Sequence, residues 1–169
     1  MIKQAIAGVN PEEFGEVTVM TVWPSVARSP LGRSLGNLFA IKTGWYIFTV
    51  GNLMALASIP VALGLYFARV APFIGIRYRL TNRRIVVARG LKAVESRAID
   101  LDRFDSISIE ILPGQAWYDA GDLVFRSGKV EVFRLEGVSR PAAFRNCCLK
   151  TWAAHVGVKK SAQRQLATV

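Results

Sequence analysis

Hydrophobic positions follow two different patterns along this chain. From Trp45 to Phe67 the sequence WYIFTVGNLMALASIPVALGLYF contains no charged residue. After Gly75 the pattern becomes alternating, as in RYRLTNRRIVVARG from Arg77 to Gly90. About 20 consecutive apolar residues are enough to cross a bilayer as a helix. Alternation with a period of two is typical of a half-buried strand. We therefore expect a membrane segment followed by a β-rich domain.

The apolar run leaves several membrane topologies open. One is a single span at about residues 45–67. Another is a helical hairpin within residues 36–76, bent between Asn52 and Pro60, since proline and small residues often mark bends in membrane helices. A re-entrant loop is a third, because the stretch is short for two full crossings. The run starts too far into the chain for a signal peptide. A domain this small could hardly bury such a helix on all sides.

Charge is concentrated after the apolar run. The chain has a net charge of +10, and residues 77–169 hold 17 of its 22 lysines and arginines. More basic residues flank the run on its C-terminal side, which by the positive-inside rule places the C-terminal domain in the cytoplasm. A single span would leave residues 1–44 outside, whereas a hairpin would keep both ends inside. The two cysteines, Cys147 and Cys148, are adjacent and offer no disulfide framework.

The alternating region predicts a small antiparallel barrel or sandwich. Its first hairpin would turn at Asn82, a residue that tolerates the left-handed conformation. Further strands are expected near residues 95–100, 105–112, 121–126 and 130–135, separated by glycine turns. Ser139 is the expected cap of a final helix with Pro141 in its first turn. Phe144 and Cys148 would share one face of that helix.

These features resemble a known family. The YxLTxxR element (Tyr78, Leu80, Thr81, Arg84) and the spacing from Ile99 to Ile109 in IDLDRFDSISI resemble the bacterial pleckstrin-homology (PH)-like membrane proteins of the YdbS type, formerly a domain of unknown function. EVTVMTVWPS, from Glu16 to Ser25, resembles the short strand that precedes their membrane segment. The resemblance covers roughly residues 14–152. It implies a bacterial inner (cytoplasmic) membrane location with both ends in the cytoplasm, which favours the hairpin.

The expected fold is therefore a membrane-anchored α+β protein, in which a hydrophobic helical hairpin precedes a PH-type barrel with a C-terminal α-helix. The expected parts are an N-terminal cytoplasmic segment with a short strand (1–35), the membrane segment (36–76), the PH-like domain (77–155) and a disordered basic tail (156–169). Since fold does not carry function, the resemblance by itself predicts no ligand.

Two groups of residues are candidate sites. The first is a row of arginines beside the membrane, expected either to face lipid headgroups or to form an ordinary solvated flank: Arg77, Arg79, Arg83, Arg84 and Arg89. The second is the loop-like stretch with Trp117, Tyr118 and Asp119, expected either to bind a protein partner or to close the barrel and touch the lipid interface.

Catalysis and nucleic-acid binding find little support in the sequence. His155 is the single histidine, and Cys148 and His155 lack two further ligands for a zinc site. Familiar nucleotide-binding, hydrolase and nucleic-acid motifs are missing. No metal, cofactor or small-molecule substrate is predicted. We expect a non-enzymatic membrane scaffold or accessory subunit with a homo-oligomeric or membrane-protein partner. The alternative is a sensor of anionic lipid headgroups.

Overall fold

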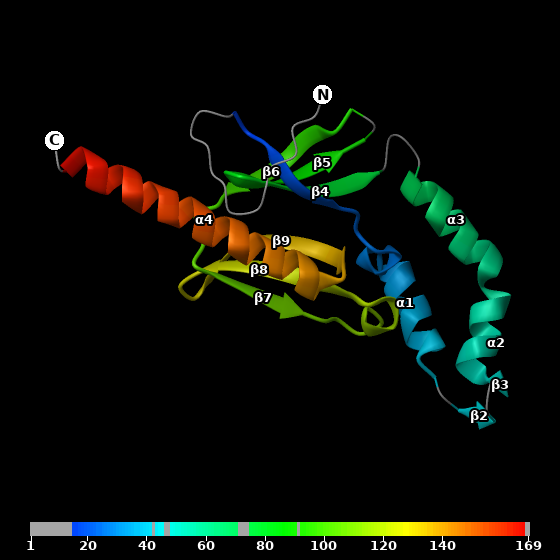
Figure 1. Ribbon diagram of the computed structural model, residues 1–169. Helices are drawn as coiled ribbons and strands as arrows, with labels where there is room; N and C mark the ends of the chain where they lie inside the picture. Colours follow the sequence, from blue (N-terminus) through cyan, green and yellow to red (C-terminus); the bar gives the residue numbers. More distant parts are fainter. Residues whose placement is uncertain (1–14, 42, 46–47, 71–74, 91, 168–169) are drawn as a thin grey trace.

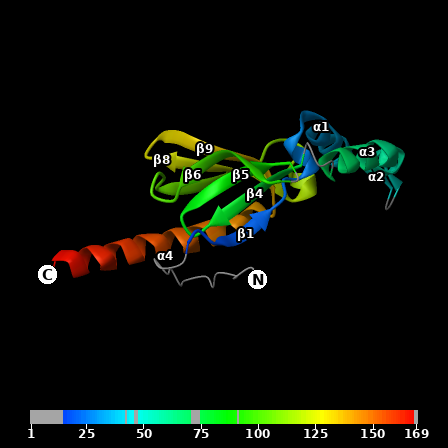
Figure 2. The ribbon, with the colours of Figure 1, turned by 90° about the horizontal axis from the view of Figure 1, so that it is seen from above.

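The computed structural model describes residues 15–41, 43–45, 48–70, 75–90 and 92–167 of the chain. It contains two larger antiparallel sheets and a long C-terminal helix, with short helices and a two-stranded sheet inserted after the first strand (Figure 1). The predicted antiparallel β domain with a C-terminal helix is confirmed. Figure 2 shows the inserted helices and the C-terminus at opposite ends of the molecule.

The larger sheet has the order β1-β4-β5-β6 and is formed by β1 (Thr18–Val22), β4 (Ile76–Thr81), β5 (Arg84–Arg89) and β6 (Val94–Asp100). The smaller sheet has the order β7-β8-β9 and is formed by β7 (Ser106–Glu110), β8 (Ala120–Ser127) and β9 (Val130–Ser139). The segment that follows β1 joins β9 of the smaller sheet, where Ser25 N–H donates to the carbonyl oxygen of Gly137 at 2.6 Å. Because β1 precedes the inserted helices, the β domain is discontinuous in sequence.

One hydrophobic core lies between the sheets, and it is filled by alternate side chains along each strand. In β4, Tyr78 and Leu80 are buried, while Arg77 and Arg79 occupy the other face. The ring of Phe125 packs edge-on between two further aromatic rings of the core. The fully buried side chains of this core include Leu80, Ile85, Leu123, Phe125 and Leu135.

The β4–β5 turn differs from the predicted one. Asn82 does not have a positive φ. It is buried instead, and its Oδ1 accepts from the N–H of Val17 at 3.1 Å. The hydroxyl of Thr81 accepts from the N–H of Arg84 at 2.9 Å and closes the turn. The prediction was wrong because it treated Asn82 as a turn residue alone, whereas its side chain holds the chain just before β1.

Helix α4 (Pro141–Ala167) covers the core with Phe144 and Cys148, both fully buried. The predicted cap is wrong: Ser139 ends β9, and its hydroxyl donates to the carbonyl oxygen of Trp23. Arg140 precedes the helix instead, with a φ of 49°. Its carbonyl oxygen accepts from the N–H of Ala143 at 3.1 Å and begins the helix.

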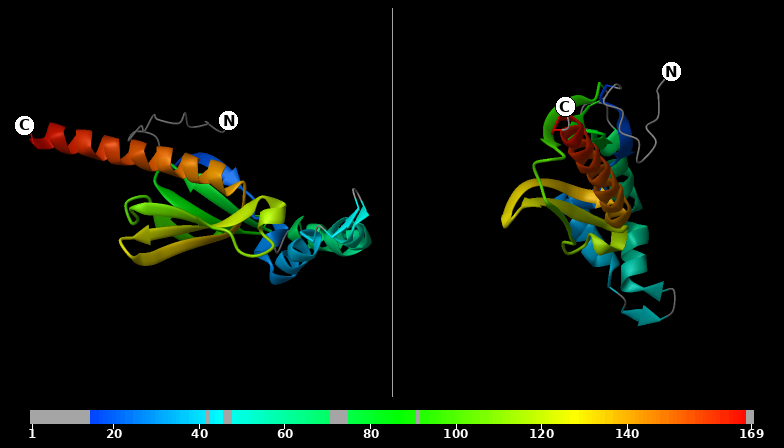
Figure 3. Two further views of the ribbon diagram at one scale, coloured as in Figure 1. Left: turned by 90° about the horizontal axis from the view of Figure 1, so that it is seen from below. Right: turned by 60° about the vertical axis from the view of Figure 1, so that its left-hand side comes forward.

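The helix also extends through most of the expected basic tail. Residues 156–167 are helical, and α4 projects past the sheets, away from the inserted helices (Figure 3). Alanine, lysine, glutamine and arginine are strong helix formers, and no proline follows Pro141. High local helix propensity therefore outweighs the polar composition that suggested disorder.

The insertion contains the 3₁₀ turn η1 (Val26–Arg28), α1 (Pro30–Phe39), β2 (Gly44–Trp45), β3 (Phe48–Thr49), α2 (Val50–Ala57) and α3 (Ile59–Val70). We call α2 and α3, residues 50–70, the arm. The break at Ser58 lies within the predicted bend. Pro60 explains it, because proline lacks an N–H donor and its ring clashes with the preceding turn.

The arm bears directly on the expected membrane segment. Among the described residues, no helix is both long enough and apolar enough to cross a membrane. The expected anchoring hairpin within residues 36–76, and the single span at 45–67, are thus without support from the structure. The physical reason is that a strand pair occupies the start of the run and Ser58 divides the rest.

Candidate functional site

The arm presents its apolar side chains outward. It projects from the end of the β domain and packs on α1 on one side (Figure 1). Most of its described large apolar side chains are half or more exposed, with Leu56 at 66% and Phe67 at 63%. Others in the same state are Leu53, Ile59, Val61, Leu63 and Tyr66. A patch of this kind on a folded chain marks an interaction surface.

Helix α1 joins the arm to the β domain through two close backbone contacts. A side chain at Gly36 would collide with the carbonyl oxygen of Gly114. A side chain at Gly51 would collide with the carbonyl oxygens of Phe39 and Ile41. The N–H of Gly51 also donates to Ile41 at 3.0 Å. Helix α1 was not predicted, although its spacing of apolar residues and the capping Ser29 are typical of a helix start.

The predicted partner loop lies at the arm end of the β domain. Trp117 and Tyr118 belong to the 3₁₀ turn η2 (Ala116–Tyr118), and the Trp117 ring packs edge-on against Phe39 of α1 at 4.8 Å. Trp117 nevertheless remains 50% exposed, while burial raises the pKa of Tyr118. Asp119 follows with a φ of 47°, and its carbonyl oxygen accepts from Arg140 N–H at 2.9 Å.

The predicted row of arginines does not form one surface. Arg89 pairs with Ile76, where β4 begins near the end of the arm. Arg83 and Arg84 lie at the opposite end of the same hairpin, five or six residues further along the strand. At about 3.3 Å per residue, the two ends are roughly 16 Å or more apart. Proximity in sequence therefore overstated how many of these arginines lie near the arm.

Several of these arginines have partners within the protein. The guanidinium of Arg84 contacts Glu16 at 2.7 Å and Glu95 at 3.1 Å. Arg79 lies 3.8 Å from Glu95. Arg77 donates to the carbonyl oxygen of Gly90 at 2.7 Å. The hydrogen bonds from Arg84 lower the pKa of Glu16 and help raise that of Arg84. These guanidinium groups thus make their contacts within the protein, largely on the outer face of the larger sheet.

The outer face of the smaller sheet likewise carries arginines that are paired with carboxylates. Arg134 contacts Glu110 at 2.9 Å and Glu131 at 2.8 Å, and Arg126 contacts Glu110 at 2.9 Å. The buried carboxylate of Asp122 accepts from Gln115 at 2.7 Å and from Gly137 N–H at 2.8 Å. It therefore connects the residue before η2 to β9.

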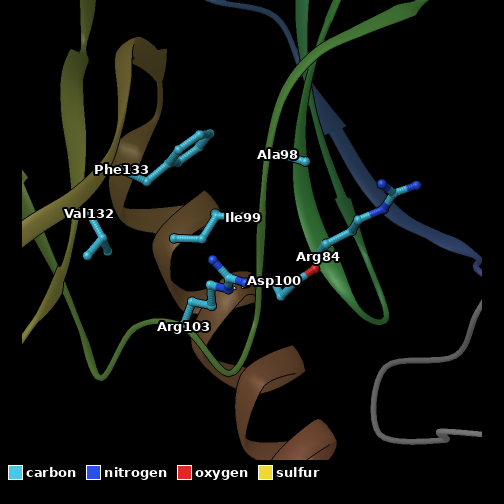
Figure 4. Close-up of a pocket in the computed structure, with 7 residues that line it drawn as sticks. All are labelled: Arg84, Ala98, Ile99, Asp100, Arg103, Val132 and Phe133. Carbon is cyan, nitrogen blue, oxygen red and sulfur yellow. Dashed lines mark ion pairs between the residues drawn. The ribbon is translucent and has the colours of Figure 1, made fainter.

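A cavity of about 510 Å³ opens between β6 and β9, near the β4–β5 turn (Figure 4). Ile99 and Phe133 contribute apolar walls, and Arg97 lies 5.0 Å above the Phe133 ring. Among the described residues that line it, Asp100 is the one carboxylate and lies 3.7 Å from Arg103. This described lining contains no histidine, cysteine or serine.

The cysteines and the histidine lie on α4. Burial raises the pKa of the Cys148 thiol, as expected for a side chain that packs in a core. His155 is partly buried, and its Nδ1 has no hydrogen-bond partner among the described residues. Within the described part of the chain, no group of three or more histidine, cysteine, aspartate or glutamate residues could hold a metal ion.

Fold and site together define a class: a PH-like β domain with a C-terminal helix, interrupted after its first strand by an apolar arm. The chain belongs to the bacterial PH domain family, whose sequence profile matches residues 26–155. This match includes α1, the arm and strands β4 to β9, and it begins after β1. Searches of curated proteins and of solved structures give no match.

Proposed function

We propose that this chain is a non-enzymatic membrane protein whose apolar arm enters the bilayer and whose PH-like domain acts as a scaffold at the membrane face. The observation that carries the proposal is the outward apolar surface of α2 and α3. Helices that are apolar all round are normally found in a protein core or in lipid. The arm contacts the rest of the chain chiefly through α1, so lipid is the natural environment for its remaining surface.

Paired substitutions that are matched in exposure test the membrane attachment. Leu56→Lys with Phe67→Lys alters the arm, and Val94→Lys with Val130→Lys alters equally exposed positions on β6 and β9. Each lysine costs about 2.5–3.5 kcal/mol at the centre of a membrane helix. The arm variant should leave the membrane fraction on carbonate extraction, and the strand variant should stay. Loss of both from that fraction, or retention of both, would contradict the proposal.

The proposed scaffold role rests on the surfaces of the β domain that remain available for contact with another protein. The outer faces of both sheets are occupied by paired arginines and glutamates, whereas the edge strands expose Val94, Val130 and Val132. Exposed strand edges are common sites of protein contact. Extraction of the full chain in mild detergent, followed by size-exclusion chromatography with light scattering, should give a defined oligomer or a complex. A monomer without partners would contradict the scaffold role.

The location follows from the same proposal. We place the PH-like domain in the cytoplasm of a bacterium, on the inner membrane, because basic residues are more abundant after the arm than before it. In intact spheroplasts, a cysteine introduced at Val130 should resist a membrane-impermeant thiol reagent and react once the cells are opened. Reaction in intact spheroplasts would place the domain on the outside.

The second candidate, an anionic-lipid sensor, has support at one end of the β4–β5 hairpin. Arg89 is exposed near the arm and makes no ion pair with another described residue. Arg83 is equally classed as exposed but lies at the far turn, so it is a matched control. Arg89→Glu should weaken preference for acidic over neutral vesicles, and Arg83→Glu should not. A preference that vanishes in raised salt would favour the scaffold alone.

A further inference from the structure

Apolar side chains are exposed beyond the arm, at the adjoining end of the β domain. They come from three different segments that the sequence analysis did not connect. Leu31 is 68% exposed and Leu38 is 41% exposed, on α1. We call the set the collar; its members are Trp23, Leu31, Leu38, Ile111 and Trp117, and their exposed fractions range from 41% to 68%.

Several contacts place the α1 and η2 members of the collar at the base of the arm. Leu31 and Leu38 are seven residues apart, so they lie on the same face of α1, and α1 packs against α2. Trp117 packs on Phe39 at the end of the same helix, at 4.8 Å between ring centroids. Figure 1 shows α1 between the arm and the two sheets.

Trp23 lies at the same end but belongs to the side of the larger sheet. Its carbonyl oxygen accepts from Ser139, and the guanidinium of Arg77 lies 5.3 Å from the centroid of its ring. Arg77 is the second residue of β4, the strand that follows the arm. Trp23 thus lies where the insertion enters and leaves the β domain, whereas Trp117 lies beside α1.

We infer that the collar contacts the headgroup region of the bilayer, so that the β domain docks on the membrane in addition to being attached by the arm. This inference rests on the proposed membrane attachment. Tryptophan is enriched at membrane–water interfaces because an apolar body and one polar N–H suit that layer. Helix α1, which carries Leu31 and Leu38 of the collar, packs directly on α2 of the arm.

Charge at this end also suits a lipid surface. Arg33, Arg89 and Arg140 have no ion-pair partner among the residues that the structure describes. Arg140 follows β9 and is bonded through its N–H to Asp119, beside Trp117. Basic side chains interspersed with tryptophans are typical of surfaces that meet acidic headgroups. If the arm lies in the bilayer, the headgroup layer surrounds its base. A protein partner bound at Trp117 would then have to displace that layer.

Tryptophan quenching by brominated lipids tests the inference on the full chain. Each variant retains one tryptophan, at position 23 or 117, with the other native tryptophans replaced by phenylalanine. The control carries Val130→Trp in the tryptophan-free chain, at a site 65% exposed on β9. In phosphatidylcholine vesicles brominated near the headgroup, Trp23 and Trp117 should be quenched several-fold more strongly than the control.

A second measurement leaves every tryptophan in place. Leu38→Cys, labelled with an environment-sensitive dye after Cys147→Ser and Cys148→Ala, should show a blue shift on vesicles, and Val130→Cys should show none. Vesicle flotation distinguishes failure of the collar inference from failure of the proposed membrane attachment. If the chain floats but the collar is quenched no more than the control, the collar inference is overturned and membrane attachment stands. If the chain does not float, the proposed function fails. Shielding of Trp117 from both lipid quencher and acrylamide would indicate a protein contact instead.

Discussion

The β domain and the arm use apolar residues in opposite ways. In the β domain, leucines such as Leu123 and Leu135 are completely buried between two sheets and α4. In the arm, Leu56 and Leu63 are more than half exposed. Apolar side chains stabilise a fold only where packing against other parts of the chain removes their surface from water. The β domain therefore buries its core leucines within the chain, whereas the arm leaves many of its apolar side chains exposed.

Charged residues show the same division. On the β domain, Arg84 and Arg134 each contact more than one carboxylate. In the arm, the one formally charged residue is Arg69, near its C-terminal end. On the two sheet faces, Arg79, Arg84, Arg126 and Arg134 are thus paired with carboxylates of the same chain. A high net charge is a weak guide to a binding surface until the pairs are known.

The largest expected effect is on packing. Leu123→Ala removes a fully buried side chain from the core and should lower the free energy of unfolding by about 2–5 kcal/mol. Leu63→Ala makes the same change at a 54% exposed position of the arm and should alter it by no more than about 0.5 kcal/mol. Denaturant unfolding of both variants in the same detergent compares them. Similar losses would mean that the arm is part of the folded core.

The next effect concerns the buried carboxylate. Asp122→Ala leaves the side-chain amide of Gln115 and the N–H of Gly137 without an acceptor, which should cost about 1–3 kcal/mol. Asp122→Asn retains one acceptor oxygen and should cost less. Thermal unfolding measures the difference. Equal stability of the alanine variant and the native chain would contradict the connecting role of Asp122.

A glycine pair tests the joint between the two regions. Gly51→Val places a side chain against the carbonyl oxygens of Phe39 and Ile41, and overpacking of this kind typically costs about 1–3 kcal/mol. Gly64 has open space around it on α3, so Gly64→Val is the matched control. Limited proteolysis should cleave the Gly51→Val chain faster between α1 and α2, with the β domain intact. Equal cleavage of the two variants would argue against a fixed joint.

The smallest expected effect is on pH dependence. Hydrogen bonds from Arg84 lower the pKa of Glu16 in the folded chain. A carboxyl group of this kind stabilises the fold above its unfolded pKa, and the contribution disappears as the pH falls through its folded pKa. Between about pH 7 and about pH 3, the native chain should lose more stability than Glu16→Gln, by at most about 1 kcal/mol for a partly exposed pair. Parallel losses would mean that the pair contributes nothing.

The strands were largely predictable because their signal is local. The stretches expected near residues 95–100 and 121–126 correspond to β6 (Val94–Asp100) and β8 (Ala120–Ser127). Alternating burial and glycine turns leave a trace in neighbouring residues. The bend in the apolar run was predictable for the same reason, since Pro60 acts on its own helix.

The features that the sequence did not reveal depend on long-range contacts. Arg84 meets Glu16, 68 residues away, once β1 pairs with β4. The close approach of Gly36 to Gly114 likewise brings α1 onto a loop that is distant in sequence. Register and approach of this kind decide which arginines are paired and which tryptophans form the collar. Residue types alone could not supply that information.

Thiol labelling in membranes tests the contrast between arm and β domain most directly. Single cysteines replace Leu63, which is 54% exposed on the arm, and Val130, which is 65% exposed on β9, after Cys147→Ser and Cys148→Ala. In opened membrane vesicles, a polyethylene-glycol maleimide should modify Val130→Cys and leave Leu63→Cys unmodified. After denaturation in detergent, both should react. Rapid modification of Leu63→Cys in the intact membranes would show that water surrounds the arm and would contradict the account.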